Sequence, residues 1–249
     1  MQGGRYSRPT SAMVLAAGLG KRMRPLTDHL PKPMISIAGR TMIDRVLDKL
    51  VEAGVRKAII NTHYKAEMLA DYIKKRQQTI DMELIISYEE VLLETGGGVA
   101  KALPYIGDEP FYAINSDIVW LDGKQPALDH LASVWDSETM DGLLLLHKVS
   151  RAIGYNGNGD FDLIGDHQLK RDNSPSFPYV FTGVQILSPK LFTDIPEGPF
   201  SLNVLYGRAR QSSGVLNRIG GVEHTGDWLH IGTPEGVRLA EEFIENKDA

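Results

Sequence analysis

The 249-residue sequence contains no cysteine. Disulfide bonds, zinc–thiolate sites and a catalytic thiol are therefore excluded. The sequence also lacks an apolar run of 18 or more residues, so we expect no membrane-spanning helix and no membrane partner. It has no excess of basic residues, because its formal net charge is −5, and we expect no nucleic-acid partner. The missing cysteines and the missing apolar leader fit a cytoplasmic protein.

The composition that remains is typical of a folded globular protein. Hydrophobic residues make up 42% of the sequence and charged residues 24%. This length suits one α/β domain, and no internal repeat or linker interrupts it. We expect a single domain over residues 11–246. Residues 1–10 are polar, include two arginines and are expected to form a flexible tail.

The first half of the chain alternates predicted strands with predicted helices. Helices at 42–51 and 66–76 separate the first three of four apolar runs, which lie at 12–17, 57–61, 82–88 and 110–115. This β-α-β-α-β order predicts a parallel sheet with right-handed crossovers. The second half adds strands at 142–147 and 179–187 and a hairpin at 161–170. We therefore predict a Rossmann-like α/β fold, with a mixed, mostly parallel sheet flanked by helices and a small β-hairpin lid.

A glycine loop follows the first predicted strand. Residues 12–17 lead into Gly18-Leu19-Gly20, and the cations Lys21, Arg22 and Arg24 come next. Glycines let backbone N–H groups approach an anion closely, and cations neutralise its charge. The loop matches neither a Walker loop nor a dinucleotide fingerprint, and taken alone it could be an ordinary turn. The whole arrangement favours phosphate binding.

Two later stretches are expected to lie beside this loop. Three consecutive glycines at 96–98 precede a helix predicted at 99–103, and they either admit a flat or anionic ligand or act as a hinge. Asn115 and Asp117 follow the strand at 110–115. A carboxylate there is either a metal or catalytic group or a turn cap. Because the carboxyl ends of parallel strands share one edge, a common site is expected.

These motifs resemble those of a known family. Residues 15–27, together with Pro31-Lys32-Pro33, resemble the signature of the sugar-1-phosphate nucleotidylyltransferases. Further segments are most similar to the N-acetylmuramate-1-phosphate uridylyltransferases of peptidoglycan recycling: 94–98, 115–117, 159–161, 181–184 and 228–233. The resemblance spans residues 11–245 and implies a glycosyltransferase-A-like nucleotidyltransferase fold with a sugar-binding lid. No β-helical C-terminal domain is expected after the helix predicted at 234–245.

The resemblance implies an enzyme that joins a nucleoside triphosphate to a sugar 1-phosphate and releases pyrophosphate. Both reactants are anionic, so catalysis would rest on positioning and charge neutralisation with a divalent metal. The preferred substrates are UTP and N-acetylmuramate 1-phosphate. One alternative is a GTP-dependent mannose- or heptose-1-phosphate guanylyltransferase. Another is a nucleotide-sugar-binding relative without catalysis.

The resemblance also implies a role for particular residues. Arg22 would contact the leaving pyrophosphate, Lys32 would neutralise charge between the phosphates, and Asp117 would hold Mg²⁺ or Mn²⁺. The implied nucleotide-binding residues are Leu15, Ala16, Ala17, Gly18, Gly20, Glu94, Gly97 and Asn115. The implied sugar-binding residues are Asn115, Asp160, Thr182 and Gly183.

The sequence departs from the family pattern at two points. The second metal ligand is usually an Asp two residues after the Trp of the last motif, where this chain has His230. Since Mg²⁺ prefers oxygen ligands, His230 would favour Mn²⁺ or another transition ion, or bind a phosphate directly. Asp227 is three residues away and would face the other side of an extended strand. No clear lysine is present for the acceptor phosphate, and Lys148 and Lys170 are weak candidates.

Overall fold

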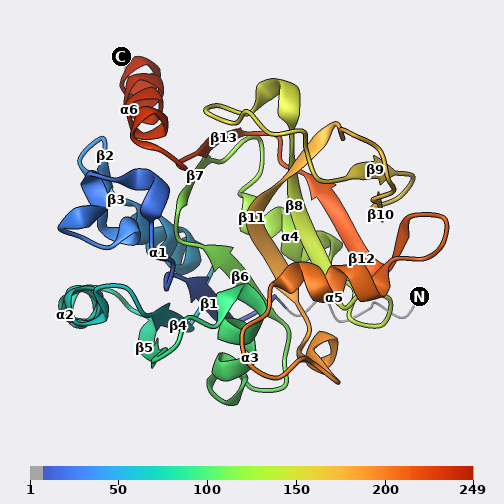
Figure 1. Cartoon of the computed structure of the whole chain (residues 1–249), viewed down its shortest axis with the longest axis horizontal. Coiled ribbons are helices and arrows are strands. Elements are labelled where there is room, and N and C mark those ends of the chain that lie inside the picture. The colour runs from blue at the N-terminus through green and yellow to red at the C-terminus, as the bar shows by residue number, and fades with distance from the viewer. Residues whose placement is uncertain (1–7, 249) are drawn as a thin grey trace.

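The computed structural model describes residues 8–248 and contains a nine-stranded mixed sheet (Figure 1). The sheet runs from the lower left of Figure 1 to its right-hand side. In their order across the sheet, the strands are β5 (Glu83–Tyr88), β4 (Lys57–Thr62), β1 (Ser11–Leu15), β6 (Phe111–Asn115), β11 (Tyr179–Leu187), β8 (Gly142–Lys148), β12 (Val215–Glu223), β10 (Gln168–Lys170) and β9 (Asp162–Ile164). The predicted mixed, mostly parallel sheet is confirmed.

The N-terminal half of the sheet is parallel. β1 pairs with β4 on one side and with β6 on the other, and β4 pairs with β5. Helices α1 (Met42–Glu52), α2 (Ala66–Gln77) and α3 (Glu94–Ile106) connect these strands. The side chain of Thr41 accepts a hydrogen bond from the Asp44 N–H, as expected of a helix cap. The predicted β-α-β-α-β order is confirmed.

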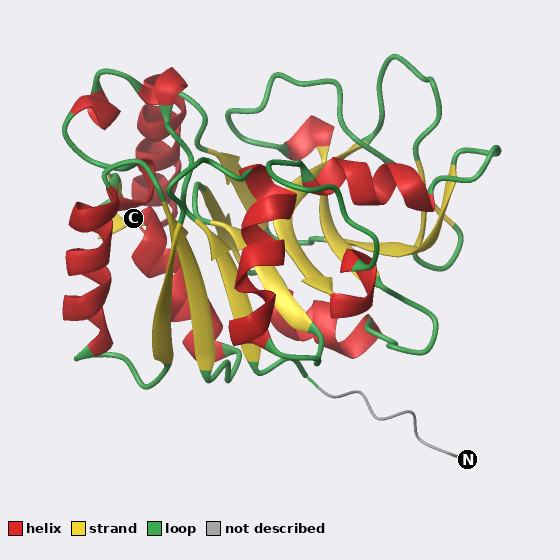
Figure 2. Ribbon diagram, turned by 60° about the horizontal axis from the view of Figure 1, so that its bottom comes forward, coloured by secondary structure: helices red, strands yellow, loops and turns green. Residues whose placement is uncertain are grey.

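The alternation of side chains along β1 explains why helices cover both faces of the sheet (Figure 2). Ala12 and Val14 belong to a core with residues of α1, α2 and α4 (Ala127–Val134). Met13 points to the opposite face and belongs to a second core with residues of α3 and α5 (Leu202–Ala209). β1, β4 and β6 are therefore buried on both faces, as their continuous apolar sequence predicts, whereas the edge strand β5 is only partly buried.

The C-terminal half makes the sheet mixed. β11 is antiparallel to both β6 and β8, and β12 is parallel to β8. The predicted hairpin is present as β9 and β10, and it extends the main sheet through an antiparallel pairing of β10 with β12.

A two-stranded arm lies beside the main sheet. It pairs β7 (Ile118–Leu121) antiparallel with β13 (Asp227–His230), so that His230 lies opposite Ile118. The closing helix α6 (Pro234–Asp248) packs on this arm and on the small hairpin of β2 (Ser36–Ile37) and β3 (Arg40–Thr41). Only two residues separate β7 from β6, which hides β7 in the sequence.

The helix predicted at 99–103 begins earlier than expected. α3 begins at Glu94, so the three glycines lie inside its first turns rather than before it. They are tolerated there because other segments approach the helix closely. A Cβ on Gly96 would lie 2.3 Å from the Phe200 ring, and one on Gly98 would lie 2.7 Å from Asn61 Nδ2.

Part of the expected N-terminal tail contacts the body of the protein. Arg8 donates a hydrogen bond to the Ala53 carbonyl and forms an ion pair with Asp129 at 2.9 Å. Residues 1–7 lie outside the described residues. In the part of the chain that the structure describes, no helix is both long and apolar enough to cross a membrane.

Candidate active site

A cavity of about 370 Å³ lies at the carboxyl ends of β1, β4 and β6. Its walls come from the glycine loop, the start of α3 and the turn after β6. It is lined by Leu15, Ala16, Ala17, Gly18, Lys32, Pro33, Asn61, Leu92, Glu94, Thr95, Asn115, Ser116, Asp117 and Ser201. The structure therefore brings most of the predicted nucleotide-binding residues to one cavity, at the edge where an open α/β sheet binds ligands.

The glycine loop is shaped by contacts on its far side. Gly20 has φ +62°, and a Cβ there would lie 2.8 Å from Thr27 Cγ2. The Thr27 hydroxyl donates to the Gly20 carbonyl at 2.9 Å and holds the turn closed. A Cβ on Gly18, by contrast, would meet nothing within 4 Å. Gly20 is thus required by the fold, whereas the backbone at Gly18 lies open to the cavity.

Lys32 and Asp117 form the main charged pair of the cavity. Lys32 Nζ lies 2.7 Å from Asp117 Oδ2, although 85 residues separate the two in sequence. The Lys32 side chain is only 10% exposed and that of Asp117 is 40% exposed. An ammonium and a carboxylate side by side can receive a phosphate and a cation, respectively. The roles that the sequence resemblance implies for Lys32 and Asp117 stay predictions.

His230 lies close to this pair. Burial lowers the pKa of His230; the nearby Asp117 carboxylate opposes this, and the Lys32 and Arg22 cations add to it. Its ring meets Tyr155 edge-on at 5.7 Å between centroids and lies 5.8 Å from the Trp228 ring. The lowered pKa favours the neutral imidazole, which is the form that binds a metal.

The donor set beside the cavity suits a cation that takes further ligands from its substrate. Among the described residues, no cluster of three or more His, Cys, Asp or Glu side chains could enclose a metal. Asp117 lines the cavity and His230 lies within electrostatic reach of it, so a cation held by these two would keep positions for phosphate oxygens and water. Asp227 is not a further donor, because it forms an ion pair with Lys247 and lies opposite Leu121, at the other end of the arm.

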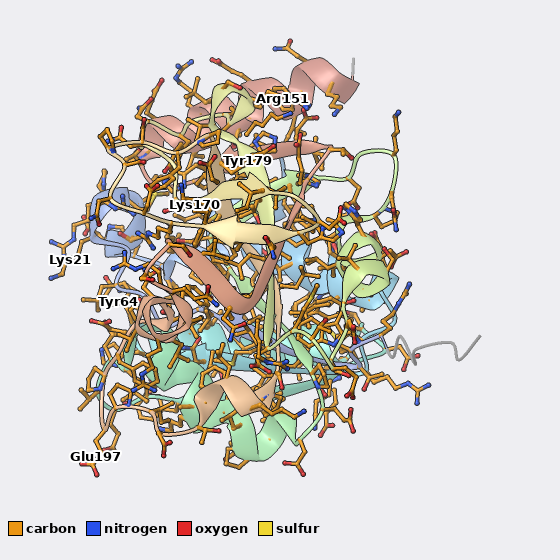
Figure 3. All side chains as sticks on the ribbon, turned by 90° about the vertical axis from the view of Figure 1, so that its right-hand side faces the viewer. Lys21, Tyr64, Arg151, Lys170, Tyr179 and Glu197 are labelled. Carbon is orange, nitrogen blue, oxygen red and sulfur yellow. The ribbon has the colours of Figure 1, made fainter. Side chains whose placement is uncertain are left out.

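Arg22 is an exposed cation near the cavity. It lies in a 3₁₀ helix, Lys21–Met23, and within electrostatic reach of His230. Among the residues that the structure describes, it has no ion-pair partner, so it is free to meet an anion. Lys21 projects from the edge of the molecule (Figure 3), and Arg24 pairs with Asp28 at 3.2 Å. Of the three loop cations, Arg22 is therefore the best placed for a phosphate.

The residues predicted to bind the sugar lie around a bulge in β11. Gly183 has φ +87°, and a Cβ there would lie 2.8 Å from Asn115 Nδ2. The Thr182 hydroxyl is fully buried and donates to the Leu145 carbonyl at 2.8 Å. Asp160 accepts a hydrogen bond from the Phe181 N–H at 2.9 Å. Gly183 thus lies next to Asn115, while Thr182 and Asp160 support the bulge. Their roles toward a sugar stay predictions.

The first turn of α3 is held by the segment before α5. The N–H groups of Gly96 and Gly97 both donate to the Phe200 carbonyl, at 2.8 and 3.1 Å. Glu94 and Thr95 line the cavity, whereas Gly97 is not among the lining residues. The Gly97 N–H is therefore occupied within the protein, and any contact of Gly97 with a base stays a prediction.

Neither candidate lysine for the acceptor phosphate is free. Lys148 lies 3.1 Å from Glu223, which also accepts a hydrogen bond from the Tyr179 hydroxyl. Lys170 lies 2.9 Å from Asp172 (Figure 3 labels Lys170 and Tyr179). Both ammonium groups are neutralised by carboxylates.

The cavity also contains residues that the motif reasoning did not assign. Asn61 lines it from the end of β4, and Ser201 lines it from the segment before α5. The signal for Asn61 is a polar residue at the end of an otherwise apolar strand. Ser201 has no comparable signal, because it reaches the cavity only through the long-range contact of its segment with α3.

Comparisons with known proteins agree with this geometry. A family model described as nucleotidyl transferase matches residues 11–155. An N-acetylmuramate alpha-1-phosphate uridylyltransferase from Caulobacter vibrioides is 39% identical over 236 residues, which cover 94% of this chain and 96% of that protein. An enzyme of the same name from Neisseria meningitidis is 35% identical, over 89% of this chain and 93% of its own.

Solved structures show the same fold. The crystal structure of HddC from Yersinia pseudotuberculosis complexed with GMP-PN matches with a TM-score of 0.75 at 24% identity. The match covers 94% of this chain and 99% of that one. At this identity the likeness concerns the fold.

Proposed function

Because the chain belongs to the nucleotidyl transferase family, we propose that it transfers a nucleotidyl group from UTP to N-acetylmuramate 1-phosphate in the cytoplasm. The products are the UDP-sugar and pyrophosphate, and the reaction recycles a sugar of the cell wall. The Lys32–Asp117 pair carries the proposal, because it sets a cation and a metal-binding carboxylate 2.7 Å apart at the glycine-loop cavity. The two uridylyltransferase relatives support the choice of substrates.

The reaction needs two anions to be brought together. An oxygen of the sugar phosphate attacks the α-phosphorus of UTP, and the bond from that phosphorus to the pyrophosphate oxygen breaks. The backbone from Leu15 to Gly20 holds the nucleotide phosphates. Lys32 neutralises charge between the two phosphate groups, and Arg22 meets the departing pyrophosphate. The chain thereby lowers the barrier by positioning and charge neutralisation, without a covalent intermediate on the protein.

The metal role belongs to Asp117 with His230 beside it. A bound Mg²⁺ or Mn²⁺ would neutralise phosphate charge and align the triphosphate. Asp117 supplies the hard oxygen ligand that Mg²⁺ prefers. His230 supplies a neutral nitrogen, since burial keeps its pKa below the ordinary value. Its imidazole shifts the preference toward Mn²⁺ relative to a second carboxylate.

The sugar lies on the side of Asn115 that faces the β11 bulge. Gly183 packs directly against Asn115 because it has no side chain, and Asn115 offers an amide to a hydroxyl or acetamido group. Asp160 and Thr182 hold the bulge in place through Phe181 and Leu145. The acceptor phosphate is met by Lys32, because both other candidate lysines are paired with carboxylates.

A guanylyltransferase acting on mannose or heptose 1-phosphate is the second candidate. The structure of HddC with a guanine nucleotide, GMP-PN, favours it at the level of fold. A non-catalytic nucleotide-sugar-binding protein is disfavoured, because Arg22, Lys32 and Asp117 are all present and lie near one another.

Pyrophosphate release tests the proposal. Purified protein is assayed with UTP, GTP, CTP and ATP against a panel of sugar 1-phosphates, with Mg²⁺ and then with Mn²⁺. We expect turnover with UTP and N-acetylmuramate 1-phosphate. We also expect the ratio of turnover with Mn²⁺ to turnover with Mg²⁺ to be higher than for a metal site with two carboxylates. Turnover with GTP and mannose 1-phosphate, and with no other pair, would refute the uridylyltransferase proposal and support the guanylyltransferase. No turnover with any pair would refute the enzyme proposal.

A further inference from the structure

A buried amide and a buried carboxylate connect the two walls of the cavity. Asn61, at the end of β4, is 2% exposed, and Glu89, just after β5, is 0% exposed. Asn61 Nδ2 donates to Glu89 Oε1 at 2.8 Å. Asn61 lines the cavity, whereas Glu89 lies behind it. Glu89 can therefore act on a ligand only through other residues.

Each member of the pair holds one wall by its backbone. Asn61 Oδ1 accepts a hydrogen bond from the Ala16 N–H at 2.6 Å, where the chain leaves β1 for the glycine loop. Glu89 Oε2 accepts from the Leu93 N–H at 2.9 Å, immediately before α3. The chain of contacts runs from Ala16 through the two side chains to Leu93. It connects the two walls through Ala16 and Asn61, which line the cavity, and through Glu89, which lies behind it.

The position of Glu89 is itself fixed. The Glu89 N–H donates to the Thr62 carbonyl at 2.8 Å, and the Glu89 carbonyl lies 2.9 Å from His63 Nδ1. The third glycine of α3 leaves space for the pair, because a Cβ on Gly98 would lie 2.7 Å from Asn61 Nδ2 and 2.9 Å from Glu89 Oε1. A side chain at position 98 would therefore displace both members of the pair.

A buried carboxylate at position 89 destabilises the fold unless hydrogen-bond donors use both of its acceptor oxygens. Burial of an ionised carboxylate is strongly unfavourable, and no ion pair to Glu89 is present among the described residues. A carboxylate has only acceptors, and here it meets two N–H donors, one on Asn61 and one on Leu93. A glutamine could accept from only one of them without turning its own N–H₂ toward the other donor.

We propose that Asn61 and Glu89 are positioning residues that set the distance between the glycine loop and the start of α3, and thereby the fit of the nucleotide. This inference rests on the proposed function, because it assumes that a nucleoside triphosphate occupies the cavity. The pair fixes Ala16 against the phosphates on one side and Glu94 and Thr95 against the nucleoside on the other.

A reversal of hydrogen-bond polarity tests the pair. Asn61→Asp and Glu89→Gln each leave two donors or two acceptors facing each other. In the double variant, the new Asp accepts from Ala16 and from the new Gln, whose carbonyl accepts from Leu93. All three hydrogen bonds return, and net charge equals that of the wild type. We expect each single variant to raise Kd and KM for the triphosphate about tenfold, and the double variant to recover most of that loss.

A matched control separates positioning from stability. Gln77 is the last residue of α2, and its side chain contacts the start of β5, at the end of that strand opposite Glu89. It donates to the Met82 carbonyl at 2.9 Å and accepts from the Leu84 N–H at 2.7 Å. Gln77→Glu makes the same exchange of amide and carboxylate and breaks one hydrogen bond far from the cavity. We expect it to lower Tm without changing Kd or KM. Gly98→Ala, which displaces both members of the pair without altering their chemistry, should raise Kd as the single variants do.

The measurements are triphosphate Kd by titration calorimetry, KM and kcat by pyrophosphate release, and Tm for every variant. Single variants that lose Tm but keep the wild-type Kd and KM would show a merely structural role and overturn the inference. A double variant no better than the singles would also overturn it. A wild type that binds triphosphate but turns over no sugar 1-phosphate refutes the proposed function, while the Kd series still decides the role of the pair. A wild type that binds no triphosphate refutes both.

Discussion

At the scale of single residues, the site depends on side chains that meet from distant parts of the sequence. Lys32 reaches Asp117 across 85 positions, and His230 comes beside them from the C-terminal arm. The types of residue were readable from motifs. Their proximity follows from the topology of the sheet, which places strand ends and the β7–β13 arm at one edge.

Asp117→Asn tests the metal role. The amide keeps the shape of the carboxylate but loses the charge that binds a cation, so we expect kcat to fall about a hundredfold or more. The fold should stay intact, since the side chain is 40% exposed. Pyrophosphate release and Tm measure the two effects.

Asp227→Asn is the matched control, because Asp227 lies on the partner strand and pairs with Lys247 away from the cavity. It should keep wild-type activity. Unchanged activity of Asp117→Asn would contradict the metal role.

His230→Asp tests the departure from the family pattern. A second carboxylate beside Asp117 provides the oxygen ligand that Mg²⁺ prefers, so we expect Mg²⁺-supported turnover to rise severalfold and the preference for Mn²⁺ to shrink. The ratio of kcat/KM with the two ions measures the change. A fall in activity with both ions would contradict the interpretation that His230 weakens a conventional Mg²⁺ site. It would indicate instead that the imidazole has a role of its own.

At the scale of elements, local patterns predicted well where local forces decide. The apolar runs became β1, β4, β5 and β6, and Thr41 caps α1 as its position suggests. The sequence predicted the three glycines at 96–98 before a helix, whereas they lie inside α3. Glycine is needed there because Phe200, Gly198 and the Asn61–Glu89 pair approach the helix closely, and no local sequence pattern contains these contacts. Likewise, the buried Thr182 hydroxyl became apparent only from the bulge in β11.

Gly96→Ala tests the close approach of the segment before α5 to α3. The new Cβ would lie 2.3 Å from the Phe200 ring, so the segment must move, and we expect a loss of about 1–3 kcal/mol in the free energy of unfolding. Denaturant unfolding measures it.

Gly207→Ala is the control for this variant, because Gly207 lies within α5 and a Cβ there meets nothing within 4 Å. It should gain roughly 0.5–1 kcal/mol from helix propensity. Equal stability of the two variants would contradict the packing argument.

At the scale of the whole molecule, buried histidines connect stability to pH. Burial lowers the pKa of four of them below the ordinary value: His130, His147, His224 and His230. The unfolded chain therefore binds more protons than the folded chain once the pH falls below about 6.5. Stability is fully present above that pH and is lost as the pH falls toward the lowered pKa values.

We therefore expect Tm to fall between pH 7.5 and pH 5.5, before most carboxylates titrate. His224→Gln removes one buried titrating group, so Tm should depend less steeply on pH even though it is lower at pH 7.5. A Tm that stays constant over this range in the wild type would contradict the argument.

The topology of the whole sheet brings the residues of the cavity together. Parallel strands deliver the glycine loop, Asn61 and Asn115 to one edge, and the antiparallel β11 brings Gly183 against Asn115. The residues predicted to bind the nucleotide and those predicted to bind the sugar thus meet at Asn115. We propose that UTP and N-acetylmuramate 1-phosphate are joined at this edge.

A competition assay tests that claim most directly. Wild-type protein is given UTP and GTP together with N-acetylmuramate 1-phosphate and mannose 1-phosphate in one mixture, and the products are identified by mass spectrometry. We expect UDP-N-acetylmuramate as the main nucleotide sugar, formed in equal amount with pyrophosphate and absent with Asp117→Asn. GDP-mannose as the main product, or no nucleotide sugar at all, would contradict it.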